Sequence, residues 1–151
     1  MEKENVSLIE AKNKDQFNKC LSIRRQVFIE EEKIDPKIEL DGEDDKARHF
    51  LLYLDKKPIG TLRVFSNTSK TEHHFGRVAV LKEHRGHGYG KALVNLTIKT
   101  LATEHTPFTV LLNAQYKRRD FYASLSFVPV SDKIFYEAGI RHIAMARKVG
   151  Y

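Results

Sequence analysis

Hydrophobic and polar positions recur along the chain with two periods, which predict both strands and helices. The stretch "NVSLIEA" near the start has the β-branched, partly alternating character of an edge strand. From residue 15 to residue 28 the hydrophobic positions recur at steps of three and four, and Asp15 is the candidate N-cap of the resulting helix. The predicted inner face of this helix comprises Phe17, Cys20, Leu21, Arg24, Val27 and Phe28.

The rest of the pattern alternates short β-rich runs with two further helices. "RHFLLYL" and "IGTLRVF" are joined by "DKKP", which predicts an antiparallel hairpin, and "HHFGRVAV" is a further strand. Helical spacing from Gly90 to about His105 predicts a long helix that Pro107 ends. The buried strand "FTVLLNA", the short helix "YKRRDFYASL" and the strands "FVPV" and "IRHIAMA" follow. No repeat or linker divides the pattern, so one mixed α/β domain is expected over residues 1–151.

Composition limits the class of protein. The content of 41% hydrophobic and 30% charged residues is typical of a soluble globular domain, and no apolar run resembles a signal peptide or a membrane span. A cytoplasmic location is therefore expected. Cys20 is the only cysteine, which excludes an intramolecular disulfide and a cysteine-based metal cluster, and we expect it to be a small core residue on a helix.

The net charge of +6 is unevenly distributed. Residues 30–45 contain nine acids and two lysines, so the remainder of the chain is strongly basic. A basic body favours contact with phosphates, whereas the acidic segment, residues 30–45, would attract a cation. Solvated faces kept for solubility are an equally simple explanation.

A glycine-rich stretch follows the fourth predicted strand. In "RVAVLKEHRGHGYGKALVNL", residues 77–96, three glycines within five residues open a helix, and such glycines let backbone N–H groups approach an anion. The stretch is not a Walker A loop, because Arg85 stands at a required glycine and Ala92 follows Lys91. Its G-x-G-x-G spacing also departs from the dinucleotide fingerprint. A purely structural turn remains an alternative.

The segment "RGHGYG", with Arg85, Gly88 and Gly90 in the pattern R-x-x-G-x-G, resembles the acyl-coenzyme A pyrophosphate loop of the GCN5-related N-acetyltransferase (GNAT) superfamily. The order of the other predicted elements and the C-terminal "FYASLSF" are similar to the same superfamily. More narrowly, "RRQVFIEEE", "DDKARHF", "GTLRV", "LLNAQ" and "AGIRHIAM" look like the small bacterial ElaA-like or YjcF-like acetyltransferases. Two positions depart from the superfamily pattern: Ser126 replaces a glycine, and Arg118 replaces a small residue.

The resemblance implies an α/β (α+β) GNAT fold: a mixed, mostly antiparallel sheet of about seven strands with about four helices, splayed in the middle to hold acyl-coenzyme A. Loop amides and the helix N-terminus would bind the coenzyme phosphates, with positive charge from Lys82, His87 and Lys91. Backbone groups of Val78 and Val80 would pair with the pantetheine arm, and the Val80 amide would polarise the thioester carbonyl. The implied coenzyme-binding residues are Val78, Ala79, Val80, Arg85, Gly86, His87, Gly88, Tyr89, Gly90, Lys91 and Gln115.

The implied reaction moves an acetyl group from acetyl-coenzyme A (acetyl-CoA) directly to a primary amine. By its place in "FYASLSF", Tyr122 matches the tyrosine that protonates the departing thiolate. The general base is open, and the candidates in order of preference are His142, Glu31, His49 and Glu32. Arg63 is a candidate for recognising an acidic group on the acceptor. The acidic segment instead favours a cationic acceptor, such as a polyamine, an aminoglycoside or a lysine side chain.

Other functions stay open on the sequence alone. A non-catalytic acyl-CoA sensor would share the fold, although Tyr122 counts against it, and succinyl or propionyl transfer would use the same site. The net charge and "YKRR" prompt a nucleic-acid-binding module, but no known nucleic-acid signature supports it. A metal site is not expected, because adjacent His73 and His74 point to opposite faces of a strand. We expect no membrane partner, and a homodimer is reasonable by the resemblance.

Overall fold

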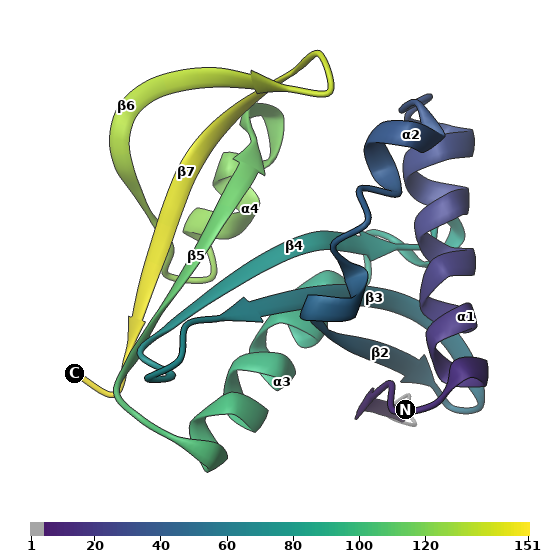
Figure 1. Cartoon of the computed structure of the whole chain (residues 1–151), viewed down its shortest axis with the longest axis horizontal. Coiled ribbons are helices and arrows are strands. Elements are labelled where there is room, and N and C mark those ends of the chain that lie inside the picture. Colours follow the sequence, from purple (N-terminus) through teal and green to yellow (C-terminus); the bar gives the residue numbers. More distant parts are fainter. Residues whose placement is uncertain (1–4) are drawn as a thin grey trace. The chain divides into compact units, whose positions relative to one another are not determined.

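The computed structural model describes residues 5–151, in which seven strands are hydrogen-bonded in the order β1-β2-β3-β4-β5-β7-β6 (Figure 1). The strands are β1 (Val6–Glu10), β2 (Arg48–Leu54), β3 (Lys57–Ser66), β4 (Glu72–Val80), β5 (Phe108–Gln115), β6 (Val128–Glu137) and β7 (Ile140–Val149). Pairing is parallel between β4 and β5 and antiparallel for β1–β2, β5–β7 and β6–β7. The predicted mixed, mostly antiparallel sheet is confirmed.

The helices follow the predicted order. The α-helices are α1 (Lys14–Arg24), α2 (Pro36–Glu39), α3 (Tyr89–Glu104) and α4 (Arg119–Ala123). A π-helix, η1 (Arg25–Glu31), continues α1, and three short 3₁₀ turns are η2 (Asp44–Lys46), η3 (Lys82–His84) and η4 (Tyr116–Arg118). No helix in the described part of the chain is both long and apolar enough to cross a membrane.

The chain forms two compact units. The first unit comprises Met1–Arg63 and Arg77–Lys99, and the second comprises Val64–Gly76 and Thr100–Tyr151. Strands β3 and β4 and helix α3 each contribute residues to both units. The glycine-rich stretch and the acidic segment belong to the first unit, whereas Gln115, Tyr122 and His142 belong to the second.

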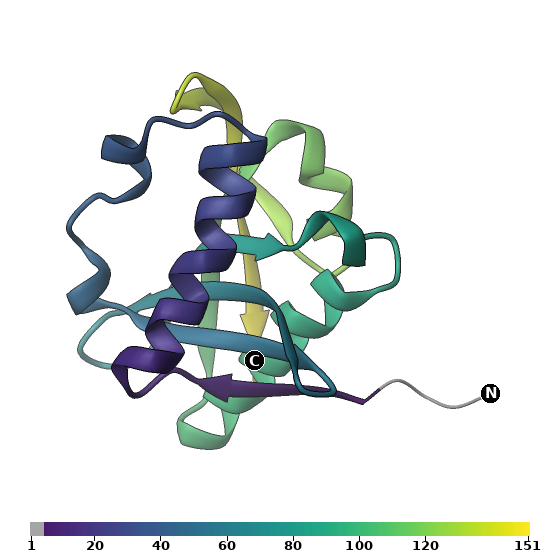
Figure 2. The ribbon, with the colours of Figure 1, turned by 90° about the vertical axis from the view of Figure 1, so that its right-hand side faces the viewer.

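In the first unit, α1 packs against β2 (Figure 2). The predicted inner face is confirmed in part: Cys20, Val27 and Phe28 lie in a buried cluster that Leu51, Ala79 and Leu81 complete from the sheet and the end of β4. Ile23, which the pattern did not include, joins the cluster, whereas Phe17 and Leu21 are only partly buried. Cys20 is fully buried in this cluster, which confirms it as a core residue. Burial also raises the pKa of the Cys20 thiol, so the reactive thiolate is disfavoured.

The start of α1 differs from the prediction. Asn13, and not Asp15, is the N-cap: Asn13 has an extended backbone and its Oδ1 accepts from Gln16 N at 2.8 Å. Asp15 lies inside the first turn, 3.3 Å from Lys19 Nζ at i+4. The apolar period locates a helix face but does not locate its first residue, so the prediction of Asp15 was wrong by two positions.

In the second unit, β7 is hydrogen-bonded to β5 on one side and to β6 on the other. Along the chain, helix α4 follows β5 and precedes β6. Most hydrophobic positions of "FTVLLNA" and "FYASLSF" are buried here, including Phe108, Val110, Leu125 and Phe127. The predicted strand "FVPV" is confirmed but is longer, because β6 continues to Glu137 with a register shift between Pro129 and Ile134.

Candidate active site

The glycine-rich stretch forms an open loop before α3 in the first unit. Gly86 and Gly88 adopt left-handed φ angles of +82° and +85°, which strongly favour glycine. A Cβ atom built on either glycine would have no atom of the protein within 4 Å. The loop leads directly into the 16-residue α3, whose first-turn N–H groups have no partner within the helix. This combination suits an anion, since the amides and the helix dipole both favour negative charge.

The side chains of the loop divide into exposed and packed groups. Lys82, His87 and Lys91 are exposed around it. Tyr89 is buried, and its ring lies 6.4 Å from the ring of His84 and 6.0 Å from that of His87. Any contact of Tyr89 with a ligand would therefore come from its backbone.

Arg85 is held by other parts of the first unit. Its Nη1 and Nη2 donate to the two carboxylate oxygens of Glu31 at 2.5 and 2.7 Å, and its Nε donates to Val80 O at 2.9 Å. The hydrogen bond to Glu31 is the main cause that raises the pKa of Arg85. The guanidinium thus ties the loop to the end of β4 and to the end of η1. The same contacts occupy the Glu31 carboxylate and one acceptor position of the Val80 carbonyl.

The strand before the loop is irregular at Arg77. Parallel pairing joins residues 72–75 of β4 to residues 109–112 of β5. Arg77 then takes a φ of +51°, and Val78, Ala79 and Val80 follow it to the end of the strand. Leu81 N donates to Ile59 O at 2.9 Å immediately after this strand.

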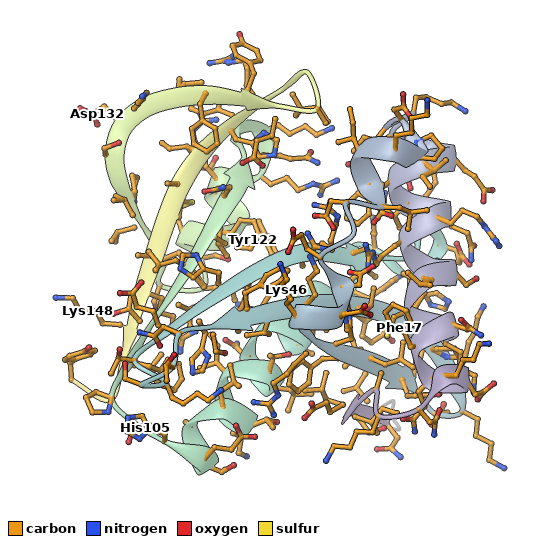
Figure 3. The ribbon with its side chains drawn as sticks, in the orientation of Figure 1. Phe17, Lys46, His105, Tyr122, Asp132 and Lys148 are labelled. Carbon is orange, nitrogen blue, oxygen red and sulfur yellow. The ribbon has the colours of Figure 1, made fainter. Side chains whose placement is uncertain are left out.

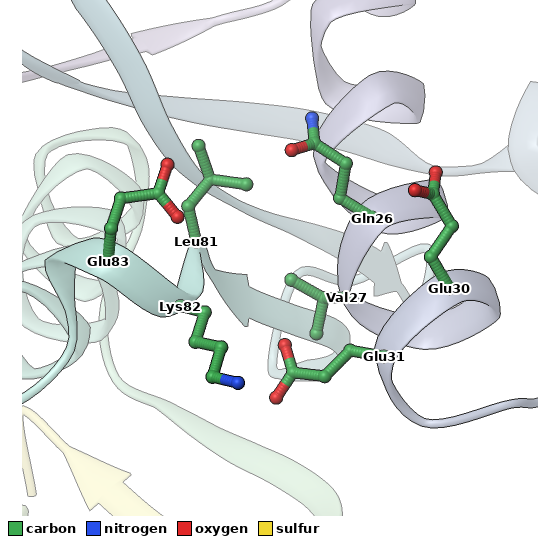
Figure 4. Close-up of a pocket in the computed structure, with 7 residues that line it drawn as sticks. All are labelled: Gln26, Val27, Glu30, Glu31, Leu81, Lys82 and Glu83. Atoms are coloured by element: carbon green, nitrogen blue, oxygen red, sulfur yellow. The ribbon is translucent and has the colours of Figure 1, made fainter.

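A pocket of about 310 Å³ lies beside the end of β4 in the first unit (Figure 4). The π-helix η1 contributes Gln26, Val27, Glu30 and Glu31, and the segment after β4 contributes Leu81, Lys82 and Glu83. The volume is at the lower end of the range for small-molecule pockets. Three of the seven lining side chains are carboxylates, so the lining favours a cationic group.

In the second unit, Tyr122 lies on α4 and is labelled in Figure 3. Its ring packs edge-on against Phe121 and Phe127, with centroid distances of 5.0 and 5.8 Å. Burial raises the pKa of Tyr122 to about 12, and the charge of Arg118 opposes this rise. The phenol is therefore a protonated hydrogen-bond donor throughout the neutral range.

His142 and Gln115 are partners across β7 and β5, so they lie on the same face of the sheet in the second unit. The Nδ1 atom of His142 lies 2.7 Å from Ile140 O. Because a carbonyl oxygen only accepts, Nδ1 carries a proton and Nε2 carries the lone pair in the neutral ring. Nε2 lies 3.9 Å from Glu137 Oε2, and Phe135 stacks on the ring at 6.0 Å. This arrangement leaves Nε2 as the proton-accepting atom of His142.

A model of the acetyltransferase (GNAT) domain matches residues 10–149 of the chain. The chain belongs to the GNAT acetyltransferase family. It is therefore an acyltransferase, as the resemblance implied.

Relatives and solved structures agree with this assignment. The GNAT chain is 30% identical over 139 residues to the uncharacterized N-acetyltransferase YjcF of Bacillus subtilis, which covers 91% of this chain and 96% of the relative. It is 34% identical over 138 residues to protein ElaA of Escherichia coli, covering 89% and 88%. The crystal structure of ElaA matches with a TM-score of 0.80 over 96% of this chain and 99% of that chain. An aminoglycoside 6'-N-acetyltransferase complexed with coenzyme A shares the fold at 14% identity and a TM-score of 0.72, covering 95% and 96%.

The acidic segment of this GNAT enzyme is largely paired within the first unit. Arg24 Nε donates to Glu39 at 2.7 Å, and both side chains are almost fully buried. Arg63 donates to Asp41 at 2.6 Å and to Asp44 at 2.9 Å. The Arg63 hydrogen bond lowers the pKa of Asp41 well below its usual range. Arg63 therefore holds carboxylates of its own chain, where the sequence suggested an acidic group of the acceptor.

Two other base candidates have structural contacts. His49 is buried, its Nε2 donates to Asp44 O at 2.9 Å, and its ring meets Phe17 edge-on at 4.8 Å. The N–H of Glu32 closes the π-helix on Val27 O at 3.0 Å. The sequence analysis missed the roles of Arg24 and Arg77, which both lie beside Glu39 of the acidic segment. The pattern showed them only as one position in a helix and one in a strand.

The two departures from the superfamily pattern have visible consequences. Ser126 adopts a φ of +69°, a conformation that glycine takes at little cost, which explains why a glycine is usual there. Arg118 is exposed at the start of α4, and its charge acts on the Tyr122 phenol. Within "YKRR", the ring of Tyr116 is covered by Arg119 at 3.9 Å and by Arg141 at 4.4 Å. Among the described residues, no group of three or more His, Cys, Asp or Glu is placed to hold a metal ion.

Proposed function

We propose that this GNAT enzyme is an acetyl-CoA-dependent N-acetyltransferase that moves an acetyl group to a primary amine of a small molecule or peptide. The observation that carries the proposal is the open loop, in which left-handed Gly86 and Gly88 face empty space at the start of α3. Such a loop fits a pyrophosphate. The coenzyme A found with the structurally similar aminoglycoside 6'-N-acetyltransferase supports the choice of donor.

The first unit supplies the proposed coenzyme contacts. Loop amides at residues 86–90 and the ammonium groups of Lys82 and Lys91 bind the phosphates, while Arg85 holds the loop through Glu31 and Val80. The acetylated coenzyme supplies an activated thioester whose acyl carbon accepts the amine. The Val80 N–H polarises the thioester carbonyl in this proposal. The Val80 oxygen has a different role, because it accepts a hydrogen bond from Arg85. In the second unit, Gln115 contacts the pantetheine arm.

Tyr122 is the proposed general acid. In this role its O–H donates a hydrogen bond to the departing sulfur and stabilises the thiolate charge as the carbon–sulfur bond breaks. A thiol has a pKa near 8.5 in model peptides, whereas that of the buried phenol is about 12, so hydrogen bonding to the developing charge carries most of its effect. We expect Tyr122→Phe to lower kcat by about 10²-fold or more while sparing coenzyme affinity. An unchanged kcat would remove Tyr122 from the mechanism.

His142 is the proposed general base. Its Nδ1–H is fixed by Ile140 O, so Nε2 accepts the proton that the amine loses. Glu31 is the second candidate, but a carboxylate that accepts two hydrogen bonds from Arg85 is a weaker base. His142→Gln should therefore reduce kcat more than Glu31→Gln, measured at saturating acetyl-CoA. The reverse order would transfer the role of base to Glu31.

The proposed acceptor is a cationic amine. Glu30, Glu31 and Glu83 line the pocket beside the end of β4. Glu31 is paired with Arg85. Among the described residues, Glu30 and Glu83 form only exposed pairs, with Arg25 at 3.3 Å and Lys57 at 4.0 Å, and exposed pairs neutralise little charge. Polyamines, aminoglycosides and lysine side chains carry several positive charges or one long cationic arm, and these suit such a lining. A panel of these amines, assayed for acetyl transfer, tests the class.

Thermal unfolding with and without acetyl-CoA tests the coenzyme site. At about a hundred times its dissociation constant, a ligand stabilises a protein by roughly 2.7 kcal/mol. The blocking variant is Gly88→Leu, which fills the open space of the loop. Its matched control is Gly139→Leu, because Gly139 has a φ of +73° and equally open surroundings in the turn before β7.

We expect acetyl-CoA to stabilise the wild type and Gly139→Leu, but not Gly88→Leu. The two variants carry the same backbone strain, so a difference between them isolates the ligand contact. If the wild type shows no stabilisation, or if Gly88→Leu is stabilised as strongly, the loop is only a structural turn.

A further inference from the structure

Arg77 has a backbone conformation that its residue type does not favour. Its φ of +51° lies in the left-handed region, within a strand, and immediately before the residues proposed to face the thioester. Gly76 precedes it and would take this conformation more readily. Conformations of this kind persist where the surroundings hold them, and they concentrate at functional sites.

The side chain of Arg77 explains why the conformation persists. Its Nη2 donates to Ile38 O at 3.2 Å, to Glu39 O at 3.0 Å and to Asp41 Oδ2 at 3.3 Å. Its Nε lies 3.3 Å from Glu39 Oε1. The guanidinium therefore binds the C-terminal carbonyls of α2 and the carboxylates beside them.

The segment that receives Arg77 is itself anchored. Glu39 is paired with the buried Arg24 of α1, and Asp41 is paired with Arg63 of β3. The backbone of residues 38–41 is thus fixed to two other elements of the first unit. Arg77 fastens β4 to this frame.

The other end of the same short stretch is also fastened. Val80 O accepts from Arg85, and Leu81 N donates to Ile59 O. Residues 78–80 therefore lie between two attachments, with Arg77 at the start and Arg85 at the end. Rotation of the peptide groups between them would break one attachment or the other.

We propose that Arg77 is a positioning residue for acyl recognition: its side chain fastens β4 to α2 and thereby aims the Val80 N–H at the acyl carbonyl of the bound thioester. This role rests on the proposed function, because it assumes acetyl-CoA at the loop. We call the contacts of the Arg77 side chain with residues 38–41 the latch. A backbone N–H that the latch positions would bond to the carbonyl of acetyl-CoA, whereas free coenzyme A has no carbonyl at the sulfur.

The test measures two dissociation constants by calorimetry, one for acetyl-CoA and one for coenzyme A. The phosphate contacts are common to both ligands, so their ratio isolates the acyl contact. A hydrogen bond to the acyl carbonyl should make acetyl-CoA bind about 2- to 10-fold more tightly than coenzyme A in the wild type.

Three arginine variants separate the side chain from the backbone. Arg77→Ala removes the latch and disfavours the left-handed backbone, whereas Arg77→Gly removes the latch and leaves that backbone accessible. Both should lose the preference for acetyl-CoA, because any weakening of the shared phosphate and pantetheine contacts changes both dissociation constants alike. The control is Arg48→Ala, since Arg48 has the same 25% side-chain exposure and pairs with Glu10 in the same unit; it should keep the preference.

Asp41→Asn is a milder variant should the Arg77 variants not fold. It weakens the latch from the partner side and should reduce the preference in the same direction. Retention of the wild-type preference in Arg77→Gly, or in Asp41→Asn, would overturn the latch. If the wild type binds neither ligand, the proposed function fails instead, and the two failures are therefore distinct.

Discussion

The glycine-rich loop, residues 84–91, and the acidic segment are the two regions that stand out in the sequence, and their side chains differ in how far the rest of the protein contacts them. In the loop, left-handed Gly86 and Gly88 face open space. In the acidic segment, Glu39, Asp41 and Asp44 are paired with arginines of the same unit. The first region has binding capacity left for a ligand, and much of the charge in the second is satisfied internally.

This difference changes the view of the acceptor. Three arginines, at positions 24, 63 and 77, offset three acids of the segment, so its attraction for a cation is weaker than the sequence suggests. The pocket carboxylates Glu30 and Glu83 lie outside that network and, within the described part of the chain, form only exposed pairs, with Arg25 and Lys57. We therefore place the electrostatic preference for an amine at the pocket, and we assign the middle of the acidic segment to stability.

The largest expected effect tests whether the acidic segment is structural. Arg24 and Glu39 expose 1% and 2% of their side chains, and removing the Glu39 charge leaves the buried guanidinium with Asp44 as its one carboxylate partner among the described residues. Glu39→Gln should lower the free energy of unfolding by about 3–5 kcal/mol, measured by urea denaturation. The control Asp15→Asn breaks the exposed pair with Lys19 and should change it by less than about 1 kcal/mol. If both variants lower the free energy of unfolding equally, the buried Glu39 pair contributes no more to stability than the exposed Asp15 pair.

A second test uses acid. The Arg63 hydrogen bond lowers the pKa of Asp41. Burial alone would raise the pKa of Asp44, but its bonds to Arg24 and Arg63 outweigh burial and lower it. Groups with a lowered pKa in the folded state contribute stability above their unfolded value, near 3.8, and lose it as the pH falls further.

The free energy of unfolding should therefore fall as the pH drops below about 4, and it should fall less steeply in Asp41→Asn. Urea denaturation between pH 5 and pH 2.5 measures both slopes. Residues 84–91, the loop region, contain no carboxylate of their own. Identical slopes in the wild type and Asp41→Asn would contradict the ionic role of Asp41.

A third test extends the comparison of left-handed residues to the second unit. Ser126 adopts a φ of +69° without the latch that holds Arg77. Ser126→Gly should therefore raise the free energy of unfolding by about 1 kcal/mol. Ser124→Gly is the control: Ser124 has a φ of −64°, so glycine should lower stability there by about 0.5–1 kcal/mol. Two effects of the same sign would refute the conformational explanation.

The smallest expected effect concerns Glu43 and Asp45. Glu43 makes an exposed pair with Lys46, and Asp45 is exposed. Converting both to their amides should change the free energy of unfolding by less than about 0.5 kcal/mol. If the segment still attracts the acceptor, KM for a polyamine such as spermidine should rise by about 2- to 3-fold at low salt. An unchanged KM for every amine tested would exclude the segment from acceptor attraction.

The fold was largely predictable because its signals are local. Strand and helix periods located all seven strands and the long helix α3, to within a few residues except at the end of β6, which continues to Glu137 beyond the predicted "FVPV". The predictions were weaker where a single side chain decides the outcome: the N-cap is Asn13, and helix α1 continues as a π-helix that the 3.6-residue period does not reveal. The candidate site was predictable in the same uneven way, with the glycine loop clear and the engagement of Arg85, Glu31 and Arg63 hidden.

By itself, the sequence determined the order of elements, the glycine loop and the family, because periodicity, missing side chains and motif spacing are properties of neighbouring residues. The tertiary structure decided which charged side chains form ion pairs within the protein and which backbone groups accept hydrogen bonds from side chains. Hydrogen bonds join Glu39 to Arg24, Arg77 to Ile38 and Glu31 to Arg85, and these partners are 15, 39 and 54 residues apart in the sequence. Hydrogen bonds and ion pairs act over a few ångströms, so folding chooses among partners that the sequence leaves equally available.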